Sequence, residues 1–70
     1  MQSLIKRSLS IAGHRTSLAL EPEFWAALEE IAAREGVSLA ALVARIDAAR
    51  DGDRGLASAL RVHALQAARR

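Results

Sequence analysis

The sequence of 70 residues contains no cysteine, a single proline, two histidines and only two aromatic residues, Phe24 and Trp25. Without cysteine, disulfide bonds cannot stabilise so short a chain, and two histidines are too few to form a zinc site. No run of apolar residues approaches the roughly 20 that a membrane-spanning helix needs. Residues 1–5 form no sustained apolar segment before Lys6 and Arg7, so we expect no signal peptide, no membrane partner and a cytoplasmic location.

Aliphatic residues are plentiful, although many of them are alanine. A chain of this length buries little surface and usually needs an additional source of stability. Because disulfides and metal sites are excluded, oligomerisation is the source that is left, and we expect an obligate homodimer. The side chains expected in its dimer core are Leu18, Leu20, Phe24, Trp25, Leu28, Ile31, Leu42 and Ile46.

The charged residues are distributed unevenly, although the net charge is only +2. Residues 1–20 and 54–70 contain basic residues and no acidic ones, whereas residues 21–53 contain all eight acidic residues. Basic ends beside an acidic middle favour an anionic partner at the ends of the chain. An ordinary solvated surface is the alternative interpretation of the same pattern.

Residues 15–20 alternate in polarity, which predicts a short strand with two different faces. The face expected to lie on the core consists of Thr16, Leu18 and Leu20. The opposite face is small, polar and basic, and consists of Arg15, Ser17 and Ala19. An unpaired strand edge attracts another strand, so we expect this strand to pair with its copy in a second chain. The product would be a two-stranded antiparallel ribbon.

The segment before this strand is ambiguous. In residues 3–12, Leu9 and Ile11 alternate with two serines, which permits a second short strand. Ala12 and Gly13 would then form a turn or a bulge, because the apolar positions change from odd to even numbers across them. A basic arm that becomes ordered only on binding is the alternative.

Three helices are predicted after the strand. The first begins at residue 22 or 23 and ends at residue 35, since proline suits the first turn and apolar residues recur every three or four positions. Gly36 is placed to end it, and Ser38 is placed to cap a second helix that extends to about residue 50. The third helix should span about residues 55–68, and its apolar side chains are Leu56, Leu60 and Leu65.

The order of strand, helix, glycine turn and serine-capped helix over residues 14–50 resembles the ribbon-helix-helix superfamily, which contains the Arc and MetJ repressors. The whole chain is similar to short bacterial members of that group, through His-Arg-Thr-Ser at 14–17, Glu-Pro-Glu-Phe-Trp at 21–25 and Ser-Ala-Leu-Arg at 58–61. The resemblance implies a mainly α fold with one short strand, in an intertwined dimer with an intersubunit antiparallel β-ribbon. The expected parts are an N-terminal arm or extra strand (1–13), a ribbon-helix-helix domain (14–50) and a C-terminal helical extension (51–70).

The same resemblance implies a DNA-binding protein that regulates transcription as a dimer. The third helix is absent from the minimal fold of the superfamily, and two roles are open for it: to thicken the dimer core or to join dimers into tetramers. In the superfamily the paired strands enter the DNA major groove. The implied base-reading residues are Arg15, Ser17 and Ala19. An exposed helix start binds anions, because its free amides and its dipole are both directed at the ligand. The resemblance therefore implies phosphate binding at the helix start formed by Ser38, Leu39 and Ala40. Lys6 and Arg7 would also bind phosphates if the protein binds DNA, and ordinary solvated tail charges are the alternative interpretation of these two residues.

A dimer that joins proteins without touching DNA is the alternative function. Ala19 cannot form a hydrogen bond with a base, the net charge is low, and the first helix is acidic. An enzyme is not expected, because the sequence has no cysteine nucleophile, no histidine near an acidic partner and no phosphate-binding loop. His14 and His63 are isolated from other metal-binding residue types, so we expect no metal and no other cofactor.

Overall fold

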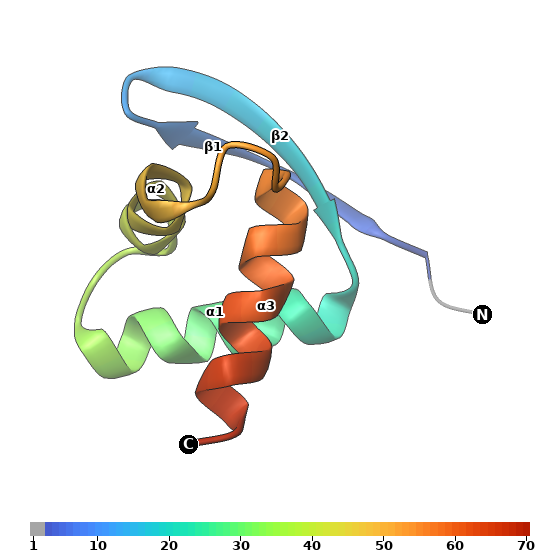
Figure 1. Cartoon of the computed structure of the whole chain (residues 1–70), viewed down its shortest axis with the longest axis vertical. Helices are drawn as coiled ribbons and strands as arrows, with labels where there is room; N and C mark the ends of the chain where they lie inside the picture. The colour runs from blue at the N-terminus through green and yellow to red at the C-terminus, as the bar shows by residue number, and fades with distance from the viewer. Residues whose placement is uncertain (1–2) are drawn as a thin grey trace.

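The computed structural model describes residues 3–70 and consists of two strands followed by three helices (Figure 1). Strands β1 (Ile5–Ile11) and β2 (His14–Leu20) form an antiparallel hairpin. The helices all lie on one side of this hairpin. They are α1 (Pro22–Glu35), α2 (Leu39–Ala49) and α3 (Leu56–Ala68).

The hairpin corrects the prediction of a single strand without a partner in its own chain. β1 pairs with β2 along its whole length, with Lys6 opposite Ala19 and Ser10 opposite Arg15. Residues 3–12 therefore contain a strand, which was one of the two alternatives. The physical reason is the short connection, because closing a two-residue turn requires far less ordering than capturing a second molecule. Pairing with a second copy stays a prediction that one chain does not test.

The turn of the hairpin is formed by Ala12 and Gly13, which have φ values of 51° and 83°. Positive φ at both central residues is the requirement of the type I′ turn, whose twist matches that of paired strands. Glycine adopts this conformation freely, whereas the Cβ of alanine meets the neighbouring carbonyl oxygen. Ala12 is therefore the strained residue of the turn.

We expect Ala12→Asn to raise the free energy of unfolding by about 0.5–1 kcal/mol, because asparagine tolerates the left-handed conformation better than alanine does. Urea denaturation of the two proteins measures the difference. Gly13→Ala is the matched control, and it should lower the free energy of unfolding. Open space surrounds Gly13, so an added methyl group meets no neighbour and only backbone strain would act. An unchanged or lower midpoint for Ala12→Asn would contradict this account of the turn.

The helix boundaries confirm the sequence prediction. Gly36 ends α1 with a φ of 71°, and the N–H of Val37 donates to the carbonyl of Ala32 at 3.0 Å. This pattern closes the last turn of a helix and satisfies carbonyls that would otherwise lack a partner. Ser38 caps α2, since its Oγ accepts a hydrogen bond from the N–H of Ala41 at 3.0 Å. Together, these two local signals set the sharp bend between α1 and α2.

The core lies between the inner face of the hairpin and the three helices. Seven of the eight side chains expected in the core are buried, and Phe24 is partly buried against them. A single chain already buries these side chains, so their place in a dimer core stays a prediction. The fully buried side chains are Leu20, Leu28, Leu42, Val43 and Leu60.

One apolar position of α3 was predicted wrongly. Leu65 is 53 % exposed, whereas Ala59 and Ala64 lie in the core beside Leu60. A residue five positions after Leu60 lies roughly 140° around the helix, so Leu65 cannot share its stripe. Alanine takes the inward positions instead, and α3 packs against both α1 and α2.

Candidate nucleic-acid interface

The outer face of the hairpin carries small, polar and basic side chains from both strands. Residues opposite one another in an antiparallel pair lie on the same face, so the register places β1 side chains beside those of β2. Five of the six side chains are exposed and Ala19 is half-buried. None of the six is acidic. This outer face consists of Lys6, Ser8, Ser10, Arg15, Ser17 and Ala19.

Two side-chain hydrogen bonds cross the outer face. Arg15 Nη1 donates to Ser10 Oγ at 3.1 Å, and the Oγ atoms of Ser8 and Ser17 lie 3.2 Å apart. The first bond restrains the guanidinium of Arg15 over the ribbon, yet leaves its other N–H groups available. Ser8 and Ser10 were not among the predicted site residues. Their alternation with Leu9 and Ile11 was the signal that could have placed them there.

Arg7 lies on the inner face of the hairpin, away from Lys6. Its guanidinium forms an ion pair with Glu29 and lies 4.9 Å from the centre of the Trp25 ring. Trp25 Nε1 donates to the carbonyl of Ile5 at 2.8 Å, so the same group of residues fastens β1 to α1. The structure thus separates two cations that the sequence prediction grouped as phosphate ligands. Glu29 already neutralises the charge of Arg7, which makes Arg7 a weaker candidate for phosphate than Lys6.

The start of α2 has the geometry expected of an anion site. The first hydrogen bond of the helix runs from the N–H of Leu42 to the carbonyl of Ser38, at 3.0 Å. The N–H groups of Leu39 and Ala40 precede that bond, at the positively polarised end of the helix dipole. Within residues 3–70, no side-chain hydrogen bond or ion pair links this helix start to the outer face of the hairpin. Its role toward phosphate stays a prediction.

A second ion pair fixes the junction between β2 and α1. Arg61 of α3 donates from Nε to Glu21 Oε1 at 3.0 Å, and its guanidinium lies 5.8 Å from the centre of the Phe24 ring. Backbone hydrogen bonding at Glu21, followed by the bond from Arg61, lowers the pKa of the Glu21 carboxyl. Desolvation opposes this lowering without reversing it. The pair holds α3 beside the start of α1, directly after the strand that carries Arg15.

We expect Glu21→Gln to make the stability of the protein less sensitive to acid. The lowered pKa means that the folded protein binds this proton less tightly than the unfolded chain does. Ionised Glu21 therefore adds stability above the unfolded pKa of about 4.3, and that stability disappears as the pH falls through the lower folded pKa. Thermal unfolding across that range, with Glu23→Gln as the charge-matched control, measures the effect. Equal pH dependence in wild type and Glu21→Gln would contradict it.

The two histidines lie in different elements, His14 in β2 and His63 in α3. Residues 3–70 contain no group of three histidine, cysteine, aspartate or glutamate side chains that could hold a metal ion. Over the same range, each helix is too short or too polar to cross a membrane.

The comparisons with known proteins agree with this architecture. The sequence model of the ribbon-helix-helix domain family matches residues 4–68, which include both strands and all three helices. Among solved structures, an uncharacterized protein from Bordetella pertussis Tohama I is similar, with 36 % sequence identity and a TM-score of 0.77. The match covers 96 % of this chain but 57 % of the Bordetella chain, so this chain spans little more than half of that protein's length. No curated protein matches. The extent of the family match shows that this chain belongs to the ribbon-helix-helix domain family.

Proposed function

We propose that this protein binds DNA and regulates transcription, with the outer face of its hairpin in the major groove. The observation that carries the proposal is the composition of that face, which holds Lys6, Arg15 and three serines but no acidic residue. The major groove admits a two-stranded ribbon, and its base edges are read by cations and hydroxyl groups. Ribbon-helix-helix domains generally bind DNA as transcription regulators, which supports the same conclusion.

Within this proposal the side chains of the outer face have different roles. Arg15 offers paired N–H donors that suit O6 and N7 of guanine, and Ser10 limits the directions in which it can point. Ser17 can donate to or accept from either base of a pair, whereas Ala19 can only contact a thymine methyl group. Lys6 and the amides at the start of α2 would contact phosphates. One arginine per hairpin predicts a permissive choice of sequence.

We propose further that the protein acts as a homodimer. The sheet has only two strands, so β1 and β2 each keep one edge without a neighbouring strand among the described residues. Such edges favour pairing with another strand, and domains of this family typically form dimers. Exposed Leu65 on α3 would suit a contact between dimers, which supports the tetramer as a higher assembly. Sedimentation equilibrium over a range of concentrations measures both states.

The test of DNA binding is its dependence on salt. With about four phosphate contacts, two from each copy, a fourfold rise in salt concentration is expected to lower the affinity about 100-fold through counterion release. Fluorescence anisotropy with a labelled random-sequence duplex measures this slope. If the protein showed no binding at low salt, DNA would be excluded and the adaptor function would take precedence.

A further inference from the structure

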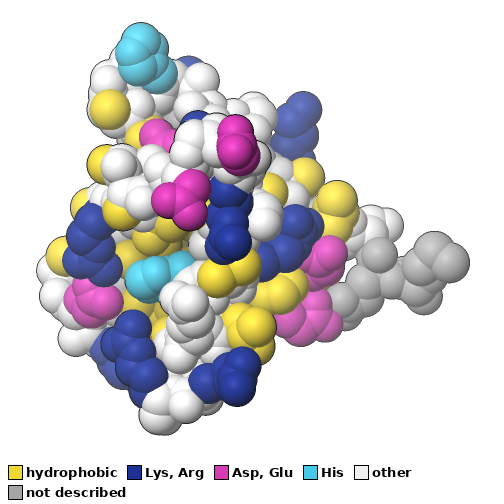
Figure 2. All heavy atoms as spheres, viewed as in Figure 1, with side chains coloured by type: hydrophobic (Ala, Val, Ile, Leu, Met, Phe, Trp, Pro, Cys, Tyr) yellow, Lys and Arg dark blue, Asp and Glu magenta, His cyan; other side chains and the backbone are white. Residues whose placement is uncertain are grey.

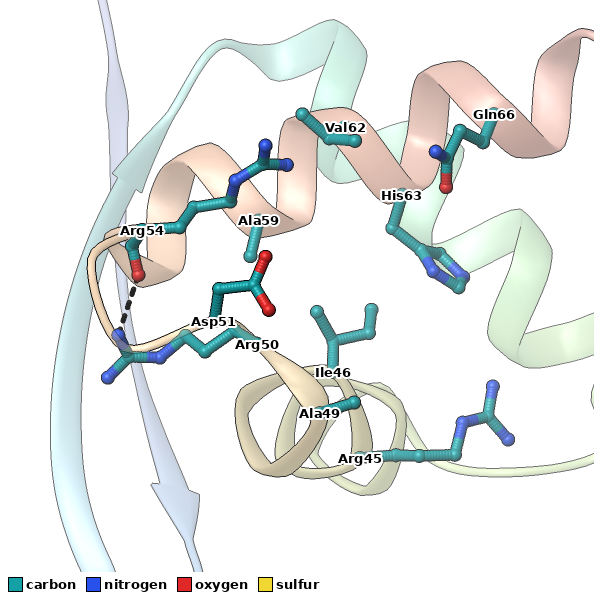
Figure 3. A pocket seen from close by; sticks show the side chains of 10 residues that line it. All are labelled: Arg45, Ile46, Ala49, Arg50, Asp51, Arg54, Ala59, Val62, His63 and Gln66. Carbon is teal, nitrogen blue, oxygen red and sulfur yellow. Dashed lines mark hydrogen bonds between the residues drawn. The ribbon is translucent and has the colours of Figure 1, made fainter.

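A hollow of about 430 Å³ lies between α2, α3 and the loop that joins them (Figure 3). Its volume falls within the range of small-molecule sites. The apolar part of its lining consists of Ile46 and Ala49 from α2, with Ala59 and Val62 from α3. Apolar surface between basic side chains is also visible on this face of the molecule (Figure 2). The hollow is built from elements other than the hairpin, and the proposed function makes no use of it.

Two of the four charged side chains of the lining, Arg45 and Arg50, already have partners. Arg45 donates to Glu35 at 2.6 Å, and Arg50 donates to Asp47 at 2.7 Å. Arg50 also donates from Nη1 to the carbonyl of Arg54, again at 2.7 Å, which fastens the loop to the end of α2. Each of these two arginines is thus already paired with a carboxylate of the protein.

Asp51 and Arg54 differ from the other charged groups of the lining. Their side chains form no hydrogen bond or ion pair with each other or with any other residue between 3 and 70. The N–H of Arg54 donates to the carbonyl of Asp51 at 3.1 Å, so a turn holds the two residues near one another. Figure 3 shows both charged groups at the loop end of the hollow, with His63 and Gln66 toward the other end. An anion and a cation without partners thus lie beside an apolar surface.

We propose that this hollow binds a small zwitterion with an apolar body, of the kind represented by an α-amino acid with a large apolar side chain. The ammonium group pairs with Asp51 and the carboxylate pairs with Arg54. The apolar side chain lies against Ile46, Ala59 and Val62. A simple anion would be repelled by Asp51 and a simple cation by Arg54, so a ligand that carries both charges fits this rim best.

The probe is L-phenylalanine, titrated into the isotope-labelled full chain while backbone amide signals are followed by NMR. We expect saturable shifts in the α2–α3 loop and the adjoining helix turns, with half-saturation on the order of 1 mM for a ligand of this size. Three matched compounds each lack one feature of the ligand. 3-Phenylpropanoate lacks the ammonium group, 2-phenylethylamine lacks the carboxylate and glycine lacks the apolar body. Each should bind about tenfold more weakly or worse, because one paired group or the apolar contact is lost.

The protein variants complete the test. Arg54→Gln and Asp51→Asn should each weaken phenylalanine binding about tenfold, since each removes one charge-assisted hydrogen bond. Asp53→Asn is the control, because Asp53 lies in the same exposed loop but does not line the hollow. Circular dichroism confirms that the variants fold. Equal binding by all three variants, equal binding of 3-phenylpropanoate, or the absence of saturable shifts would overturn the proposal. The readout uses the free protein, so the result is independent of DNA binding.

Discussion

Trp25→Ala is expected to lower the free energy of unfolding by about 3–5 kcal/mol, the usual range for removing a large buried aromatic side chain. Trp25 is 2 % exposed and contacts two different residues of β1 at once. Its indole N–H donates to the carbonyl of Ile5, and its ring lies under the guanidinium of Arg7. A domain of this size has a total stability of only about 4–10 kcal/mol, so this loss would remove a large part of the total.

Far-UV circular dichroism with urea titration measures this loss. Trp25→Phe is the matched control, because it keeps an aromatic ring in the core and removes only the indole N–H and part of the volume. It should lose about 1–3 kcal/mol, chiefly because the Ile5 carbonyl loses its donor. If Trp25→Ala unfolded at the wild-type urea concentration, Trp25 would not be the residue that fastens the hairpin to α1.

Arg15→Ala is expected to weaken DNA binding by about 1–3 kcal/mol, or roughly 5- to 150-fold, if Arg15 forms a bidentate contact with guanine. Because Arg15 is exposed and bonded only to Ser10 among the described residues, its loss should leave the fold intact. Anisotropy titration on a selected duplex and on a random one measures both parts of the effect. The loss should be larger on the selected duplex, since base contacts act only there.

Arg34→Ala is the control for Arg15→Ala. Arg34 is an exposed arginine of α1 whose partner is Glu30, at 3.4 Å, so its removal changes the net charge without changing the hairpin. Ser10→Ala should weaken binding less than Arg15→Ala does, because it releases the guanidinium without removing it. Equal losses for Arg15→Ala and Arg34→Ala would show that net charge, and not groove contact, controls affinity.

The helices were predictable because their signals are local. Pro22 in the first turn, Gly36 at the end of α1 and Ser38 at the start of α2 each act on the backbone within a few residues. The hairpin was less predictable because its turn is not one of the usual pairs. Type I′ turns favour Asn-Gly, and Ala-Gly gives a weaker signal with one strained residue. From the sequence, a strand before this turn therefore stays one of two alternatives, beside an arm that becomes ordered only on binding.

The part of the candidate site that lies on β2 was predictable from the sequence of that strand, but the surface formed by both strands together was not. Alternation placed Arg15, Ser17 and Ala19 on one face, and the register is consistent with that shared face. Ser8 and Ser10 can be added to this face only when the register of β1 with β2 is known, because the register decides which residues lie opposite one another. The turn sets that register, and the sequence of one strand does not reveal it. Arg7 is a second example. Lys6 lies on the outer face, whereas the next residue, Arg7, lies on the inner face and reaches Glu29.

A ribbon made by one hairpin has two chemically different halves. A ribbon made from two copies of one strand looks the same after a half-turn, and so it matches a palindrome. Here one strand offers Lys6 with two serines, and the other offers Arg15 with Ser17 and Ala19. A single copy in the groove would therefore distinguish the two directions along the duplex. The relative orientation of repeated sites, inverted or direct, would then report how neighbouring copies are arranged on the DNA.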